Sequence, residues 1–160
     1  MAKKKSKQPK FSNDVRIENR RARFEYSVVD TLEAGIELSG CEVKSLRLGT
    51  ASLVDTYATP RGEQLFLRGM HIKPYEQGNY ENTDPIRERR LLLHRKEISR
   101  LIGLVSQKGY TLVPLRIYFN DRGWAKVKLG VCQGKKAHDK RETIKQRDME
   151  RELRREMKVR

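Results

Sequence analysis

Residues 110–131 read YTLVPLRIYF-NDRG-WAKVKLGV and carry the clearest strand pattern of the chain. Tyr110–Phe119 is rich in β-branched and aromatic residues, and Asn120–Gly123 has the composition of a hairpin turn. Beyond the turn, one set of side chains alternates with another: Ala125, Val127, Leu129 and Val131 against Trp124, Lys126 and Lys128. The alternation predicts two antiparallel strands, the second with one buried face. Pro114 places the first strand at a sheet edge or at a bulge.

Further short strands are predicted on the amino-terminal side of this hairpin. They are Phe24–Leu38, with a bend or bulge at Glu33–Gly35, then Ala51–Ala58 and Gln64–Ile72 joined by a turn at Pro60–Gly62, and Leu91–Leu93, which alternatively begins a helix. Two helices are predicted, Cys41–Leu48 before Gly49 and Lys96–Lys108 before Gly109. Pro74–Pro85 has the composition of a long surface loop. The pattern favours a mainly β fold with peripheral helices, in particular a closed antiparallel β-barrel of the oligonucleotide-binding (OB-like) type, because closure removes exposed strand edges.

The net charge of +15 is concentrated at the two ends of the chain. Met1–Arg23 has nine Lys and Arg against two acids, and Gly134–Arg160 has eleven against six, which leaves +3 for the residues between them. Basic arms on a small domain are typical of nucleic-acid binding, because each cation near a phosphate releases counterions. An anionic membrane surface is the competing partner, but neither arm has the apolar face of an interfacial helix.

Composition excludes several other classes of protein. Met1–Lys5 is followed by polar residues, so no signal peptide is predicted, and no run approaches the ~20 apolar residues of a membrane span. We therefore expect a cytoplasmic protein with no membrane partner. In that compartment Cys41 and Cys132 are expected to be reduced core residues, and two isolated cysteines make a poor zinc site.

The 160 residues fit one domain with extensions. We expect a disordered basic arm over residues 1–13, a folded domain over 14–133, and a basic tail over 134–160. The junction Gly134–Arg141 carries four cations and almost nothing to bury, so it is either a solvated linker or a segment that a phosphate-rich partner orders. Ile144, Met149, Leu153 and Met157 form a thin apolar stripe after it. We expect the tail to be disordered when free and helical when bound, since isolated helices of this length are marginal.

The sequence places few residues for catalytic chemistry. His71, His94 and His138 are scattered, with His94 placed to cap the following helix, and the spacing supports neither a Ser-His-Asp nor a Cys-His grouping. No phosphate-binding GxxxxGK[ST] loop is present. We therefore expect no enzyme activity, no cofactor and no metal.

A binding surface is better supported by the residue types. Strand aromatics that face solvent can stack on unpaired bases, although most strand aromatics are core residues; the candidates are Tyr26, Tyr57, Tyr118 and Trp124. Trp124 with Lys126 and Lys128 forms a basic-aromatic face and is the better candidate for RNA binding.

Several motifs in order along the chain resemble those of the SsrA-binding protein (small protein B) family. They are Asn19–Tyr26 (NRRARFEY), Leu32–Gly35 (LEAG), Gly40–Arg47 (GCEVKSLR), Arg90–Leu93 (RLLL), Lys126–Val131 (KVKLGV) and Gly134–Arg141 (GKKAHDKR). The resemblance covers nearly the whole chain from Asn19. It implies a closed OB-type barrel and a bacterial translation factor that is not an enzyme. Such proteins bind the tRNA-like domain of transfer-messenger RNA and, with elongation factor Tu held through that RNA, bring it to ribosomes stalled on messages without a stop codon.

The resemblance also implies which residues meet each RNA. For the tRNA-like domain it points to Asn19, Arg20, Arg21, Arg23, Tyr26, Glu33, Tyr57, Leu92 and His94, beside Trp124, Lys126 and Lys128 from the strand pattern. For the ribosomal decoding centre it points to Gly134, Lys135, Lys136, His138, Asp139, Lys140 and Arg141, with His138 stacked on a ribosomal base. The tail helix would then occupy the empty message channel through Lys145, Arg147, Arg151, Arg154, Arg155 and Met157.

Three other functions remain open from sequence. A structural ribosomal protein would be present at one copy per ribosome, a nuclease would turn over RNA in a metal- or His138-dependent way, and a generic barrel for single strands would show little preference for folded RNA. A monomer is the expected state.

Overall fold

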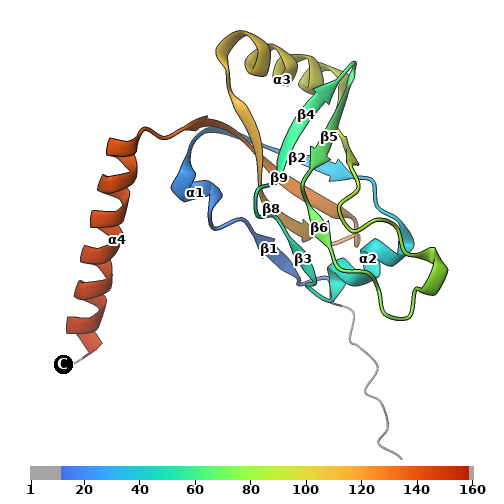
Figure 1. Ribbon diagram of the computed structural model, residues 1–160, viewed down its shortest axis with the longest axis horizontal. Helices are drawn as coiled ribbons and strands as arrows, with labels where there is room; N and C mark the ends of the chain where they lie inside the picture. The colour runs from blue at the N-terminus through green and yellow to red at the C-terminus, as the bar shows by residue number, and fades with distance from the viewer. Residues whose placement is uncertain (1–11, 159–160) are drawn as a thin grey trace, which may run out of the picture.

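The computed structural model describes residues 12–158. Figure 1 shows a β-rich body and one long helix that leads away from it at the carboxyl end. The strands are β1 (Arg16–Glu18), β2 (Tyr26–Ile36), β3 (Ala51–Ser52), β4 (Tyr57–Arg61), β5 (Gln64–Arg68), β6 (His71–Ile72), β7 (Arg89–Leu92), β8 (Thr111–Phe119) and β9 (Ala125–Gly134). The helices are α1 (Ala22–Glu25), α2 (Gly40–Arg47), α3 (Arg95–Lys108) and α4 (Ala137–Lys158), with a 3-10 turn at Asn79–Glu81.

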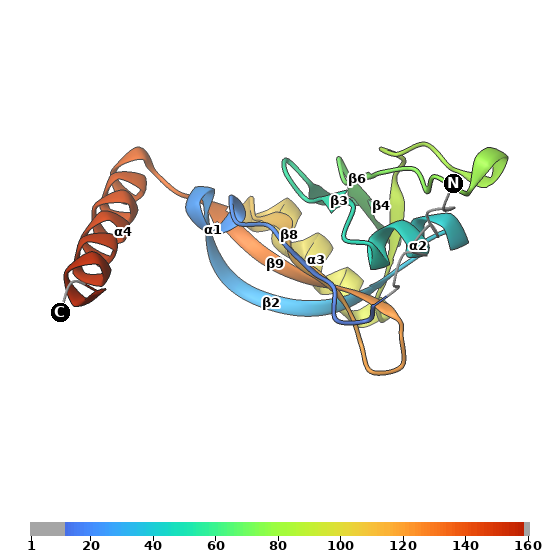
Figure 2. The same ribbon diagram turned by 90° about the horizontal axis from the view of Figure 1, so that it is seen from below.

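Within residues 12–158, seven of the strands form one antiparallel sheet in the order β1-β8-β4-β5-β7-β2-β9. Strand β8 also pairs with β9, so the pairings that leave β8 through β4 return to it through β9. The two longest strands, β2 and β9, curve side by side along the body in Figure 2. The short strands β3 and β6 pair separately. The fold is therefore mainly β with several helices, as the sequence predicts.

The core lies on the inner side of the strands. The alternation predicted for β9 is confirmed, because Val127, Leu129 and Val131 are at most 1 % exposed. Leu46 of α2 and Leu101 of α3 belong to the same hydrophobic core cluster as these three residues, although the two helices lie outside the sheet. Both cysteines are buried and free, and burial raises the pKa of the Cys132 thiol to about 11.

Several predicted boundaries are confirmed. Gly109 ends α3 with a left-handed φ of 64°, a conformation that costs glycine little. The register between β8 and β9 shifts between Pro114 and Arg116, so Pro114 lies at a bulge. Asn120–Gly123 turns β8 into β9, and Leu91 belongs to a strand rather than to the next helix.

Two strands that the sequence predicts as continuous are each divided into two in the structure. Ala51–Ala58 splits into β3 and β4 at Asp55, which has a φ of 55°, and Gln64–Ile72 splits into β5 and β6 at Gly69, which has a φ of 81°. The two breaks coincide because the two segments are in close contact at this point. A Cβ on Gly69 would lie 2.8 Å from the carbonyl oxygen of Asp55. Both halves of the hairpin therefore turn together, and β3 and β6 leave the main sheet.

The amino-terminal segments also differ from expectation. The bulge of β2 lies between Val28 and Asp30 against β9, and not at Glu33–Gly35. Residues 14–23, for which no strand is predicted, contribute the edge strand β1 beside β8. Most of the predicted basic arm, residues 1–11, lies outside the described residues.

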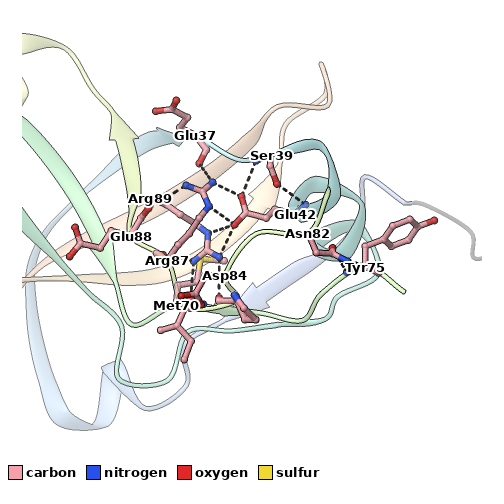
Figure 3. Close-up of polar contacts among 12 residues, drawn as sticks. Glu37, Ser39, Glu42, Met70, Tyr75, Asn82, Asp84, Arg87, Glu88 and Arg89 are labelled. Carbon is pink, nitrogen blue, oxygen red and sulfur yellow. Dashed lines mark hydrogen bonds and ion pairs between the residues drawn. The ribbon is translucent and has the colours of Figure 1, made fainter. Parts of the chain in front are cut away.

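A buried ion network fixes helix α2 against the loop before β7 (Figure 3). Ser39 and Glu42 form a capping box, and the Glu42 carboxylate also accepts hydrogen bonds from Arg87 at 2.5 and 2.9 Å and from Arg89 at 2.9 Å. Arg89 is fully buried and donates further to the carbonyl oxygens of Met70 and Pro85. Burial alone would raise the pKa of Glu42, but the hydrogen bonds from Arg87 and Ser39 and the charge of Arg89 lower it to about 2.

Across residues 12–158, no helix has the length and apolar character needed to cross a membrane.

Candidate RNA interface

The outward side chains of the neighbouring strands β2, β9 and β8 form one surface, here called the outer strand face and defined by Glu33, Arg116, Tyr118, Lys126 and Lys128. The register brings them together: Glu33 lies opposite Lys128, which lies opposite Arg116, and Lys126 lies opposite Tyr118. Their neighbours along each strand point into the core. The outer strand face therefore follows from the alternation of side chains along each strand, in which every second side chain points outward.

Glu33 is the acidic centre of the outer strand face. The hydroxyl of Tyr118 donates to Glu33 Oε2, and the Nζ atom of Lys126 lies 3.7 Å from Glu33 Oε1. The Glu33 side chain keeps 51 % of its surface exposed. Its carboxylate is thus held by two neighbours and still open to hydrogen-bond donors from a partner.

Leu92 and Tyr57 continue the outward surface across β7 and β4. Leu92 lies opposite Gly35 of β2, where a Cβ would come within 3.1 Å of the Leu92 Cβ, so the absence of a side chain leaves room for Leu92. Leu92 and Tyr57 are both exposed although they are apolar or aromatic. His94, two residues after Leu92, is the N-cap residue of α3, and its backbone N–H donates to Glu97 Oε2 at 2.9 Å.

Trp124 stands at the tip of the β8–β9 hairpin. Its backbone N–H donates to the Asn120 side chain at 2.8 Å, which fixes the turn, while the residue is 67 % exposed. A large aromatic side chain held in solvent on a rigid turn can stack on a base or a ring.

Asn19 is a supporting residue beside β8, just before α1. It is 8 % exposed, its side-chain amide donates to the carbonyl oxygens of Leu53 and Pro114, and its side-chain oxygen accepts from the N–H of Ala22. Both polar atoms of its side chain are therefore engaged within the protein, where they hold the start of α1.

The cations next to Asn19 differ in how far they are engaged. Arg21 pairs with Glu25 at 3.3 Å and with Asp55 at 3.7 Å, whereas Arg20 and Arg23 form no ion pair within residues 12–158. Tyr26 packs against the small cluster around Cys132 and is only partly exposed.

The junction to the tail is fastened to α1. Gly134 is the last residue of β9 and lies opposite Tyr26, and the Lys135 N–H donates to the carbonyl oxygen of Glu25 at 3.0 Å. The Lys135 Nζ atom donates to the carbonyl oxygen of Arg23 at 3.2 Å and to Thr143 Oγ1 of α4 at 3.3 Å. Lys135 thus ties the body to the helix, and Lys136 begins the first turn by accepting from the N–H of Lys140.

Helix α4 carries the remaining residues of the predicted tail site. His138 is largely exposed, with Nδ1 3.6 Å from Glu142 Oε1, and the Arg147 guanidinium lies 5.5 Å from the ring of Phe24 in α1. Other members of the predicted tail site lie along the helix, at Asp139, Lys140, Arg141, Lys145, Arg151, Arg154, Arg155 and Met157. The apolar stripe is exposed along its length at Ile144, Met149, Leu153 and Met157. This face is free in the described structure to contact a partner.

The two predicted sites meet in one cavity of about 560 Å³ between α4 and the body. Arg20, Arg23 and Lys128 of the first set line it together with Arg147, Arg151 and Arg154 of the second. Sequence reasoning missed Arg116, which also lines the cavity; its outward position in the alternating strand β8 was the available signal. In the described part of the chain, no group of three or more His, Cys, Asp or Glu side chains is placed to hold a metal ion.

Comparisons with known proteins cover the body and the tail together. A family model described as SmpB protein matches residues 16–159. The SsrA-binding protein of Acetivibrio thermocellus is 55 % identical over 144 residues, which cover 90 % of this chain and 93 % of that protein. The SsrA-binding protein of Gloeothece citriformis is 58 % identical over 142 residues, 88 % of this chain and 91 % of that one. A solved chain described under "tmRNA-SmpB: a journey to the center of the bacterial ribosome" is 55 % identical, with a TM-score of 0.65 over 76 % of this chain and 85 % of that one.

Proposed function

The chain belongs to the SmpB protein family, and from that premise we propose that it is an RNA-binding translation factor for ribosome rescue by trans-translation. It binds the tRNA-like domain of transfer-messenger RNA and delivers it to stalled ribosomes, with elongation factor Tu engaged through the RNA. The observation that carries the proposal is the match of residues 16–159, body and tail alike, to one family. The protein works as a monomer in the cytoplasm, without a cofactor and not as an enzyme.

The body is the part that recognises transfer-messenger RNA. The return of the strand pairings to β8 supports a closed antiparallel barrel of the OB-like type for residues 14–133. The outer strand face presents Lys126 and Lys128 to phosphates and Glu33 to amides or 2′-hydroxyls. Tyr57, Leu92, His94 and Trp124 extend it with exposed apolar or aromatic surface for unstacked bases.

The amino-terminal segment adds positive charge to the body interface. Arg20, Arg21 and Arg23 position phosphates from α1 and the turn before it, and Asn19 and Tyr26 hold that segment in place. Residues 1–13 act as a basic arm that adds non-specific attraction.

The tail, residues 134–160, is the part that tests the ribosome for a missing message. Helix α4 has 22 residues and is about 33 Å long. Its cations neutralise ribosomal RNA in the message channel, and His138 stacks on a base at the decoding centre. A message in the channel excludes the helix by volume and by charge. The tail exchanges between a disordered free state and the helix, which the channel stabilises.

A purified translation system programmed with a message lacking a stop codon tests this division of labour. The full chain should support tagging of the stalled peptide, and a chain ending at Gln133 should bind transfer-messenger RNA but fail to support tagging. If the shortened chain tags as well as the full chain, the tail has no role in rescue. If neither chain tags, the protein is not a rescue factor.

A further inference from the structure

The cavity between α4 and the body is lined mainly by cations. Its cationic side chains are Arg20, Arg23, Arg116 and Lys128 from the body and Arg147, Arg151 and Arg154 from the helix. Only two carboxylates share the lining, Glu18 and Glu150. The volume of about 560 Å³ lies within the range of small-ligand sites.

Most of these cations have no carboxylate partner. Within residues 12–158, only Arg151 of the seven forms an ion pair, an exposed contact of 3.6 Å with Asp148. The Nε atom of Arg116 is buried and has no hydrogen-bond partner among the described residues, although its guanidinium lies 5.1 Å from the ring of Tyr118. A buried donor without a partner costs free energy.

The first half of the helix is nevertheless fastened to the body. Lys135 bonds to Arg23 and Thr143, and Arg147 lies over Phe24, so the helix starts at a fixed point beside α1. Like charges on the two walls repel one another across the cavity. The tail–body arrangement therefore gains stability from a multivalent anion that lies between the walls.

Phosphate groups fit this lining of arginines and one lysine. Guanidinium groups bind phosphate oxygens in a bidentate way, and six of the seven cations are arginines. A single phosphate would meet only some of them, whereas a chain of adjacent phosphates could span from Arg116 and Lys128 to Arg147 and Arg154.

We propose that the cavity is a binding site for a run of closely spaced phosphates, and that filling it holds α4 folded against the body. This goes beyond the proposed function, because one ligand engages cations of both RNA interfaces at once. While bound, it withholds Lys128 from transfer-messenger RNA and Arg147 and Arg154 from the message channel. The ligand is either a free inorganic polyphosphate or the backbone of a short RNA strand, which share this chemistry.

Calorimetric titration of the full chain with inorganic tripolyphosphate at near-physiological salt tests the site. One molecule should bind per chain. Two paired variants, Arg116→Gln with Lys128→Gln on the body and Arg147→Gln with Arg154→Gln on the helix, should each weaken binding at least tenfold. Lys96→Gln with Lys108→Gln, two exposed lysines of α3 outside the cavity, removes the same charge and should change the affinity less than twofold.

A six-nucleotide uridine strand provides the second arm of the experiment. The natural ligand is the one of the two whose binding is lost in both wall variants and kept in the α3 variant. This result supports the site whether the ligand is tripolyphosphate or the uridine strand. If both ligands lose affinity equally in all three variants, net charge alone explains the binding and the proposal is wrong.

Two further readouts separate this inference from the proposed function. Tripolyphosphate should slow amide hydrogen exchange in α4, and a chain ending at Gln133 should lose the site while keeping its preference for transfer-messenger RNA. If the shortened chain loses that preference while the full chain still binds tripolyphosphate, the proposed function alone is contradicted. Unchanged exchange in α4 on saturation would contradict the inference alone.

Discussion

The Nζ atom of Lys135 donates a hydrogen bond to the carbonyl oxygen of Arg23 at 3.2 Å, across 112 residues of sequence. The same Nζ atom donates to Thr143 Oγ1 in the second turn of α4. One lysine just after β9 therefore links the segment that carries Arg20, Arg21 and Arg23 to the helix of the tail. The direction of α4 depends on this residue more than on any apolar packing, because the apolar stripe of the helix is exposed.

Lys135→Met should loosen the start of α4 while leaving the body intact. Losing these hydrogen bonds removes about 0.5–1.5 kcal/mol each from the local stability. Amide exchange from Asp139 to Thr143 should become several-fold faster, with the melting temperature of the body unchanged. Lys140→Met, in the same helix and without a side-chain hydrogen bond in the described structure, is the control and should leave exchange near its original rate.

Glu42→Gln should be among the most destabilising single substitutions in the body. It leaves the buried Arg89 without its counter-charge, and breaking a buried pair from one side costs about 3–5 kcal/mol. Urea unfolding should show the loss at an unchanged m-value. The matched control is Glu88→Gln, whose carboxylate pairs with Arg61 and Arg68 at the surface, and it should cost far less. Equal losses for the two variants would show that the buried network is not the anchor of α2.

The carboxylate of Glu42 also makes the free energy of unfolding depend on pH. The folded pKa of Glu42 is about 2, below its ordinary value of 4.5, so ionised Glu42 stabilises the fold above about pH 4.5. That contribution, roughly 3 kcal/mol, should be lost progressively as the pH falls from about 4.5 toward about 2. Unfolding free energies measured over this window should fall in the unaltered chain and fall less steeply in Glu42→Gln. Parallel curves would contradict the assignment.

Lys128 and Lys126 should differ in their contribution to RNA binding. Lys128 has no carboxylate partner within the described residues, while Lys126 lies 3.7 Å from Glu33, which already offsets part of its charge. Lys128→Gln should reduce the slope of log K against log salt by about 1 for transfer-messenger RNA, and Lys126→Gln by less. Lys96→Gln on α3 should leave the slope unchanged. A larger effect at Lys96 than at Lys128 would place the interface elsewhere.

Much of the body could be predicted from local sequence. The alternation from Ala125 to Val131 indicates which side of β9 is buried, and the same argument places Lys126 and Lys128 on the outside. Gly109 and Pro114 mark a helix end and a bulge through their own backbone limits. These features depend on neighbours in the chain, so a single sequence is sufficient for them.

The features that sequence reasoning missed depend on contacts between distant segments. The strand break at Asp55 follows from the contact between Asp55 and Gly69. The secondary-structure propensities of the residues carry no information on such a contact. Arg89 is buried, and so is Leu91 two residues later. Alternation along the strand could therefore have indicated that Arg89 points inward. Its partner Glu42 could not be predicted in this way, because it lies 47 residues away. The cavity depends on how α4 is directed from Lys135, and the sequence of the tail alone carries no information on that direction.

Competition binding at near-physiological salt tests the central claim most directly. Labelled transfer-messenger RNA is challenged with ordinary transfer RNA and with an unstructured strand, for the full chain and for a chain ending at Gln133. The account predicts that the shortened chain keeps a strong preference for transfer-messenger RNA, because recognition belongs to the body. If that preference vanishes, or if all three RNAs compete equally, the protein binds RNA through its basic extensions and the division between body and tail is wrong.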